Sequence, residues 1–195
     1  MFLPPMLLEK REHSFDDDCF IFEPKIDGHR LILSVQGGGI RLYTRHGNDV
    51  TRQYPELHDV PIADGPDIVL DGEVAVVDPS TGAVDFEAVM ERFLLKKDLR
   101  IREASVRQPV HYFVFDILQY GGEDLRVQPL MERKRLLNEV LTNTPYYSKV
   151  IHVEGAGKSL FELIKQRGME GIVAKRRDSV YVGQRDAAWQ KIINY

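Results

Sequence analysis

Cysteine and long apolar runs are scarce in this chain. Cys19 is its single cysteine among 195 residues, which excludes an intrachain disulfide and a cysteine zinc cluster. No apolar run approaches the roughly 20 residues that a membrane span needs. The apolar start, MFLPPMLLEK, is too short for a signal peptide and lacks the leading positive charge of one. We therefore expect a cytoplasmic protein with no membrane association.

An excess of basic residues is also missing, since the net charge is −4. Dedicated DNA-binding domains are usually basic, although a net charge does not describe a local groove. Hydrophobic residues make up 43% and charged residues 29%, as in average globular proteins. A chain of this length can bury a core without metal or disulfide staples. We expect one domain over residues 1–195.

The apolar patterning predicts a mixed α+β chain. Strands are predicted at 20–24, 29–35, 40–44, about 68–77, about 111–118 and in the closing segments GIVAK and AAWQKII. Helices are predicted at 86–94 with Asp85 as N-cap, at roughly 130–142, and from the capping box Ser-Leu-Phe-Glu at Ser159 to Gly168. This order favours mostly antiparallel sheets with flanking helices.

Four clusters place charged residues inside or beside apolar strand runs. They are Glu23-Pro-Lys25-Ile-Asp27-Gly28-His-Arg30, Asp71-Gly72-Glu73, Phe113-Val-Phe115-Asp116 and Glu170-Gly171-Ile-Val-Ala-Lys175. A carboxylate in mid-strand is costly to bury unless it meets a cation or a metal. Each cluster alone is weak evidence: the first and the fourth also fit a surface strand edge, and the third, with Phe113, fits an ordinary core strand. Together, in this order, they indicate one shared site.

With these clusters in place, the sequence resembles the covalent nucleotidyltransferases, the superfamily of polynucleotide ligases and messenger-RNA capping enzymes, from about residue 5 to 193. Glu23 two places before Lys25, the stretch at 43–47 (YTRHG) and the EGIVAK form look like ATP-dependent DNA ligases of bacterial and phage type. The resemblance implies an ATP-grasp-like nucleotidyltransferase fold, as in the adenylation domain of a DNA ligase.

The resemblance also implies a role for each matching residue around the nucleotide. Lys25 would attack the α-phosphate of ATP, expel pyrophosphate and carry AMP as a phosphoramidate. Glu23 would recognise the adenine edge, and Phe115 would stack on the face of the base. Lys175 and Lys191 would hold the α-phosphate and offset negative charge as pyrophosphate leaves.

Further residues are implied for the sugar, the metal and the DNA. Glu73 and Glu170 would lie near the ribose and ligate Mg²⁺ or Mn²⁺, which suit oxygen ligands. Arg30 and Arg45 would bind the sugar or a DNA phosphate through planar bidentate donors, and Ile26 would contact the nucleotide. The implied protein is a nucleoid-associated monomer that passes AMP to the 5'-phosphate of a nick in double-stranded DNA and forms the phosphodiester bond.

Two features depart from the ligase pattern. The usual Trp-x-Lys-x-Lys reads Trp189-Gln-Lys191-Ile-Ile193 here, so Ile193 stands where a second lysine is common. The sequence also ends at Tyr195, before the OB-fold with which ligases continue. Nick sealing is therefore expected to need an OB-fold module or a repair partner.

One segment is a false match to a phosphate-binding motif. The segment GAGKS at 155–159 follows an apolar run and looks like the end of a P-loop. That pattern requires a glycine at position 152, which is occupied by His152. We interpret the segment as the start of a helix.

Two alternatives to a DNA ligase remain open. An RNA ligase or a capping-type nucleotidyltransferase would use the same lysine with another nucleotide or acceptor. A ligase-like module that binds nucleotide or DNA without turnover would keep the pattern and lack the chemistry. Labelling from ATP or from GTP separates these possibilities.

Overall fold

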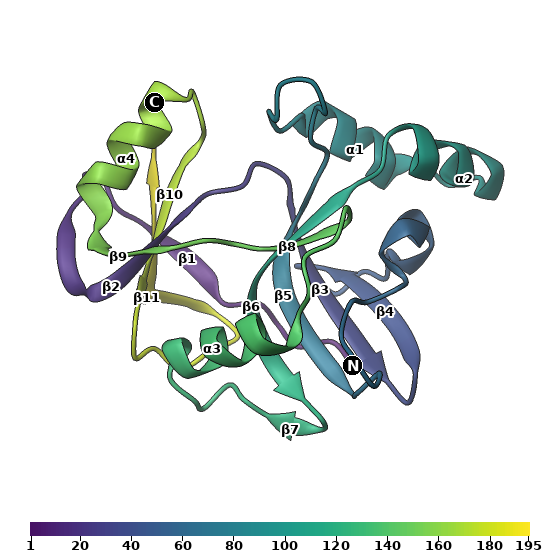
Figure 1. Cartoon of the computed structure of the whole chain (residues 1–195), viewed down its shortest axis with the longest axis horizontal. Coiled ribbons are helices and arrows are strands. Elements are labelled where there is room, and N and C mark those ends of the chain that lie inside the picture. Colours follow the sequence, from purple (N-terminus) through teal and green to yellow (C-terminus); the bar gives the residue numbers. More distant parts are fainter.

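Two β-sheets stand side by side in the computed structural model, which describes residues 1–195 (Figure 1). Sheet A consists, in spatial order, of β1 (Leu7–Lys10), β11 (Arg185–Ile193), β10 (Gly171–Arg176), β2 (Asp16–Pro24) and β9 (Val153–Ala156). Sheet B consists of β4 (Gly39–Thr44), β3 (His29–Gln36), β5 (Ile68–Ala75), β6 (His111–Tyr120) and β7 (Glu123–Asp124), with β8 (Tyr147–Lys149) also beside β6. All pairs are antiparallel except β1 with β11 and β6 with β8, so the predicted fold class is confirmed.

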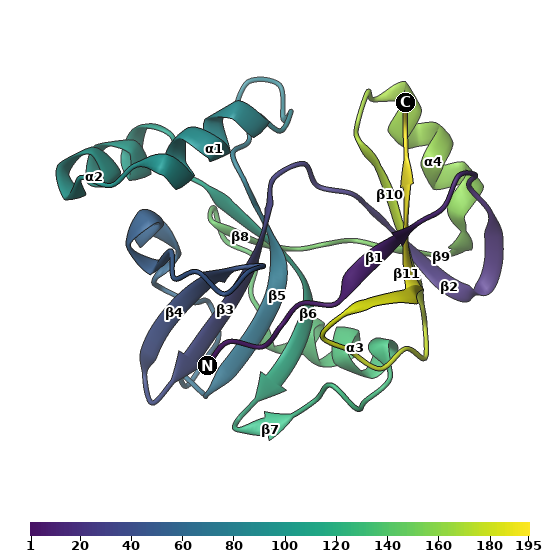
Figure 2. The same ribbon diagram turned by 180° about the vertical axis from the view of Figure 1, so that it is seen from behind.

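Helices flank both sheets. They are α1 (Phe86–Leu94), α2 (Asp98–Arg107), α3 (Leu130–Val140) and α4 (Gly157–Gln166), with short 3-10 turns at Thr51–Gln53 and Pro55–Leu57. α4 covers sheet A, α1 and α2 lie at the far end of sheet B, and α3 lies beneath the junction of the sheets (Figures 1 and 2). None of these helices is long and apolar enough to span a bilayer.

Three apolar clusters hold these layers together. The largest, with 22 buried residues, lies on the side of sheet B that faces α1. A cluster of seven packs sheet A against α4 through Phe22 and Ile164. The third, with nine buried residues, joins the sheets, because Ile21 of β2 and Trp189 of β11 meet Ile32 of β3. Alternation along β3 explains this, since Leu31 and Leu33 face the large cluster while Ile32 faces the junction.

Two helix starts were predicted from capping residues, and the structure confirms the one at α1 and contradicts the one at α4. Asp85 caps α1 as predicted, because its side chain accepts a hydrogen bond from the Ala88 amide. The capping box at Ser159 is wrong: α4 begins at Gly157 and has no side-chain cap. A Cβ at Gly157 would lie 2.2 Å from the Phe15 carbonyl oxygen. Tight packing therefore explains why a glycine occupies this position in the GAGKS segment.

The sequence pattern also missed several elements. α2 was not predicted, because it buries only Ile101 and Ala104 and shows little amphipathic pattern. The strands β1, β7, β8 and β9 were missed as well, each having four residues or fewer. Phe113 lies in the core strand β6 as expected, but its own side chain is half-buried and packs beside the His111 ring, 4.7 Å between centroids.

Candidate active site

Lys25 lies where the chain crosses from sheet A to sheet B, between β2 and β3. Its backbone amide donates a 2.9 Å hydrogen bond to the Gly171 carbonyl of β10. The crossing is tight, since a Cβ at Gly28 would lie 2.0 Å from the carbonyl oxygen of Val74 in β5. Glycine is therefore required three residues after the lysine, and the KxDG pattern fixes Lys25 at the junction of the sheets.

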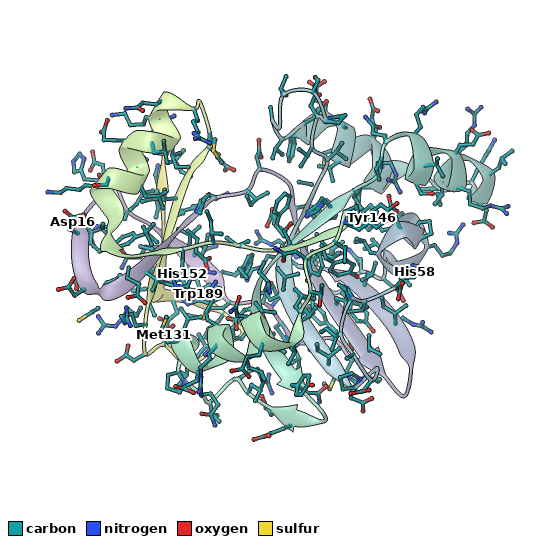
Figure 3. The ribbon with its side chains drawn as sticks, viewed as in Figure 1. Asp16, His58, Met131, Tyr146, His152 and Trp189 are labelled. Atoms are coloured by element: carbon teal, nitrogen blue, oxygen red, sulfur yellow. The ribbon has the colours of Figure 1, made fainter.

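A pocket opens at this junction and encloses about 430 Å³, its mouth included. It is lined by Leu8, Glu23, Pro24, Lys25, Ile26, Arg30, Glu73, Phe115, Val150, Val173, Lys175 and Trp189. Seven of these were predicted from the sequence to contact a nucleotide: Glu23, Lys25, Ile26, Arg30, Glu73, Phe115 and Lys175. Trp189 is labelled in Figure 3, in the half of the molecule built on sheet A.

Strand register brings the sheet A residues together. Val173 of β10 pairs with Glu23 of β2 and with Lys191 of β11, and Lys175 pairs with Trp189. Residues directly opposite each other share one face of a sheet. Glu23, Lys175 and Lys191 therefore project from the same face, although Lys191 lies outside the pocket lining.

Sheet B presents its own site residues through pairing and a bulge. Arg30 of β3 lies opposite Glu73 of β5. Along β5 and β6 the pairing jumps from Asp116 to Val114, which leaves Phe115 as the extra residue of a β-bulge. Bulges re-aim side chains and are common next to active sites. This one accompanies the turn of the Phe115 ring into the pocket.

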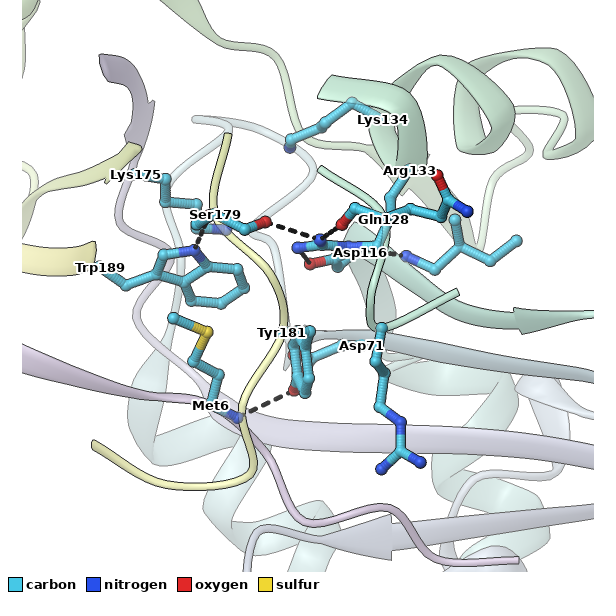
Figure 4. Close-up of polar contacts among 12 residues, drawn as sticks. Met6, Asp71, Asp116, Gln128, Arg133, Lys134, Lys175, Ser179, Tyr181 and Trp189 are labelled. Carbon is cyan, nitrogen blue, oxygen red and sulfur yellow. Dashed lines mark hydrogen bonds and ion pairs between the residues drawn. The ribbon is translucent and has the colours of Figure 1, made fainter. Parts of the chain in front are cut away.

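At the closed end of the pocket, one carboxylate meets two ammonium groups. Glu23 is buried and forms an ion pair with Lys134 of α3 through Oε2 and a 2.6 Å pair with Lys175 through Oε1. Burial opposes ionisation of Glu23, but Lys134 and Lys175 outweigh it and lower the pKa of this carboxyl. Figure 4 shows both lysines above Trp189.

The Lys175 ammonium fills the space between two aromatic rings. Its Nζ lies 3.9 Å from the ring centroid of Phe115 and 4.1 Å from that of Trp189. Burial lowers the pKa of Lys175 to about 8, against the opposing effect of Glu23. Despite the close ion pair, Nζ makes no hydrogen bond of acceptable geometry. A buried donor without a partner is costly, so this group is available to a ligand.

At the open end, Lys25 meets a single glutamate. Its Nζ donates a 2.8 Å hydrogen bond to Glu170 Oε1, and the two side chains are 21% and 29% exposed. The second oxygen, Oε2 of Glu170, is buried without a partner. Both residues also line an adjoining cavity of about 1050 Å³, counted with its open side, which Asp27 and Arg167 border. Burial and the charge of Glu170 raise the pKa of Asp27.

Glu73 lies between the two ends. Burial raises its pKa to about 7, with Asp71 and Glu170 adding to the effect and Arg30 and Lys25 opposing it. No group of three metal-ligating side chains is present. Mg²⁺ nevertheless often takes only one or two carboxylates together with waters and substrate phosphates. Glu73 and the unpartnered oxygen of Glu170 fit that kind of site.

The other two carboxylates in mid-strand meet arginines, as burial demands. Arg30 donates to both oxygens of Asp71 at 2.7 Å and to the Met6 carbonyl at 2.8 Å. Tyr181 donates a further hydrogen bond to Asp71. The corresponding pair on β6 joins Asp116 to Arg133, as Figure 4 shows. Arg30 thus reaches the pocket with most of its guanidinium already engaged.

Two predicted residues lie outside both cavities. Arg45 is exposed on the turn after β4. Lys191 is half-buried on β11. The pocket does not bring either side chain to Lys25.

Lys134 is the site residue that sequence reasoning missed. It looks like part of the charged run Glu132–Arg135, yet it lies four residues after Leu130 and three before Leu137, both buried. That spacing puts Lys134 on the apolar stripe of the helix. A lysine on such a stripe was the signal available in the sequence.

Comparison with known proteins identifies the family. Residues 5–192 match the family described as ATP dependent DNA ligase domain. The chain belongs to the ATP-dependent DNA ligases. It is similar over its whole length to the SPbeta prophage-derived DNA ligase-like protein LigB of Bacillus subtilis, with 44% identity over 196 residues, covering 68% of that protein.

Longer members of the family are similar to this chain over part of their length. The multifunctional non-homologous end joining protein LigD of Mycobacterium bovis is 36% identical over 173 residues, which are 87% of this chain and 21% of LigD. The solved mycobacterial DNA ligase D complexed with ATP and MES superposes with a TM-score of 0.81 at 30% identity, over 99% of this chain and 60% of that one. The ligase-type fold expected from the sequence is thereby confirmed. This chain spans 68% of the length of LigB, 21% of that of LigD and 60% of the solved ligase D chain.

Proposed function

We propose that residues 1–195 act as the adenylation domain of a DNA ligase, with Lys25 as the residue that carries AMP. The observation that carries this proposal is the position of Lys25, which lines both the aromatic pocket and the larger, charged cavity beside it. In the reaction, Nζ forms a bond to the α-phosphorus of ATP as the bond from phosphorus to the pyrophosphate oxygen breaks. The amine proton leaves toward Glu170, which already accepts a hydrogen bond from it.

The closed end of the pocket suits the base. Phe115 offers an aromatic face, and stacking is sequence-tolerant because every base has one. Glu23 supplies a charged acceptor beside it, which suits the amino group of adenine. The ammonium of Lys175 lies at this end, against Glu23 and Phe115. Its position favours contact with the base over the α-phosphate contact that the resemblance implies.

The open end suits the phosphates. Arg30 and Glu73 line the pocket together with Lys25. Lys191 shares the sheet face of Glu23 and Lys175 but lies outside the pocket lining, so its proposed contact with the α-phosphate rests on the family resemblance. Glu73 and Glu170 would hold Mg²⁺ or Mn²⁺, a divalent ion that would offset the charge of the leaving pyrophosphate.

The acceptor we propose is the 5'-phosphate at a nick in double-stranded DNA, with Arg45 on its backbone. Exposed and outside the pocket, Arg45 is placed for a partner larger than a nucleotide. Completion of sealing would involve an OB-fold module or a repair partner. The name of the LigD relative refers to non-homologous end joining, which supports a repair role, and we propose that this role is carried out at the nucleoid.

Incubation with ATP or GTP labelled at the α-phosphate, in the presence of Mg²⁺, tests the proposal. Label from ATP should stay on the protein through denaturing electrophoresis and disappear in Lys25→Ala. Label from GTP alone would favour capping chemistry instead. A folded protein that takes label from neither, even with an OB-fold supplied, would be a binding module without turnover.

Transfer to nucleic acid is the second half of this test. Adenylated protein freed of ATP is mixed with a duplex nicked between DNA strands, and with one whose nick is flanked by RNA. We expect label to move to the 5'-phosphate of the DNA nick. Preferential transfer to the RNA nick would assign the chain to RNA ligation.

A further inference from the structure

Lys134 contacts Glu23, which lines the proposed base end of the pocket, but does not line the pocket itself. It comes from α3, and its ammonium contacts Glu23 Oε2. The side chains of Lys134 and Glu23 are 6% and 2% exposed. The contact thus joins residues 111 positions apart in a buried setting, where an ion pair is held strongly only if its geometry is fixed.

Lys134 does not itself line the nucleotide pocket. It borders a different cavity, with Asn138, Lys149 and His152, and Val150 separates that cavity from the pocket. Among the residues that line the pocket, Lys134 forms its ion pair with Glu23, so Glu23 is the direct route by which it influences a nucleotide. Glu23 presents its other oxygen to the pocket, where Lys175 is its neighbour.

The two lysines give Glu23 a definite chemical state. A buried glutamate without cations takes up a proton and becomes a donor as well as an acceptor. Lys134 and Lys175 keep this carboxylate charged, and bonds from opposite sides fix its orientation. A charged, fixed carboxylate accepts a hydrogen bond from the amino group of adenine and repels the carbonyl oxygen that guanine carries at the same position.

We propose that Lys134 is a positioning residue for nucleotide choice: by holding Glu23 ionised and oriented, it makes the site select adenine over guanine. This inference rests on the proposed function of the pocket. Lys134 acts by disfavouring the protonated state of Glu23, and it touches no reacting atom.

The variant that tests this is Lys134→Met, with Lys134→Arg as the conservative replacement. Arg135→Met is the matched control, because Arg135 is the next residue on α3 and is exposed, in a surface pair with Glu132. Labelling kinetics are measured with ATP and with GTP, and equilibrium binding of both nucleotides is measured in parallel. Thermal unfolding reports whether each variant is folded, and Lys134→Gln replaces Lys134→Met if the latter is not.

We expect Lys134→Met to raise the KM for ATP by about 10- to 100-fold and to lower the ATP preference over GTP by a similar factor. The labelling rate at saturating ATP should stay within about threefold, a difference of about 0.6 kcal/mol in the activation barrier. Lys134→Arg should restore most of the preference, and Arg135→Met should match the parent. In Lys134→Met, ATP binding should also strengthen as pH rises through the now higher pKa of Glu23, because the protonated acid present at low pH becomes the charged acceptor that suits adenine.

An unchanged ATP preference in folded Lys134→Met would overturn the inference. So would an equal loss with both nucleotides, or a lower saturated rate at constant KM, since either indicates a structural or phosphate-end role. These results differ from failure of the proposed function itself. In that case the parent protein takes no label, and the binding measurements with ATP and GTP still decide the role of Lys134.

Discussion

Each end of the pocket pairs a lysine with a glutamate, in opposite surroundings. At the base end, Glu23 is buried against Lys134 and Lys175. At the mouth, Lys25 and Glu170 are partly exposed and border an open cavity. A buried carboxylate between two cations cannot reorganise without a large penalty, whereas a half-exposed pair can separate and exchange protons with solvent. The fixed carboxylate of Glu23 suits recognition of a base, and the separable pair of Lys25 and Glu170 suits chemistry at a phosphate.

The largest effects are expected from replacing the lysine at each end, because one replacement should lower the rate of the reaction and the other should weaken ATP binding. Lys25→Arg should lower labelling by ATP by at least about 1000-fold, because a guanidinium does not deprotonate to become a nucleophile. Lys175→Met should raise the KM for ATP while labelling at saturation persists. Rapid-quench labelling over a range of ATP concentrations measures both. A large fall in the saturated rate of Lys175→Met would return Lys175 to the α-phosphate.

Removing the glutamate at each end should have unequal effects on stability. Glu23→Ala leaves two buried ammonium groups without a counter-charge, and we expect a loss of about 3–5 kcal/mol in the free energy of unfolding. Glu170→Ala breaks a partly exposed pair and should cost about 1 kcal/mol or less. Urea unfolding monitored by the fluorescence of Trp189 gives both values. Equal losses would show that the two ends do not differ in rigidity.

Glu73, between the ends, should link stability to pH. Its pKa is raised from 4.5 to about 7, so the folded protein keeps a proton that the unfolded chain has lost. The free energy of unfolding should then fall as pH rises from about 4.5 to about 7, by up to about 3 kcal/mol, and level off above. Glu73→Gln should flatten this decline in urea titrations at pH 5, 6, 7 and 8. Saturating Mg²⁺ should weaken it in the parent, since a bound cation favours the carboxylate.

The smallest effect is expected outside both ends. Arg45→Ala should leave labelling by ATP unchanged and weaken binding to a nicked duplex. A lost phosphate contact should reduce the slope of log affinity against log salt concentration by about 1. Binding titrations at several salt concentrations test this, with Arg41→Ala as the control, because Arg41 lies on β4, four residues before Arg45, and already pairs with Asp49. A changed labelling rate would place Arg45 at the nucleotide instead.

The sequence predicted residues that lie on strands more reliably than residues that act through a helix. Glu23, Glu73 and Phe115 could be found because charges or aromatics interrupt β-patterned runs, and these strands meet at the junction of the sheets. Lys134 could not be found in this way, since a lysine within a charged run on a helix is ordinarily solvated. Only the packing of α3 against β6, which brings Lys134 to Glu23 of β2, buries it.

The start of α4 shows the converse error. Ser159 carries a local capping signal, but Gly157 fits closely against the Phe15 carbonyl, and this tertiary contact extends the helix by two residues. The bulge that turns Phe115 into the pocket has no signature in the sequence either, because it depends on how β5 and β6 align.

The ammonium between Phe115 and Trp189 has a consequence for how fast a nucleotide enters. An adenine that stacks on Phe115 must first displace Lys175, so entry is an exchange of one ring partner for another. A cation on an aromatic face is worth roughly 0.5–2 kcal/mol, and part of the stacking energy of the incoming base is used to replace it. Ligands that stack weakly, however well charged, therefore meet a competitor already in place.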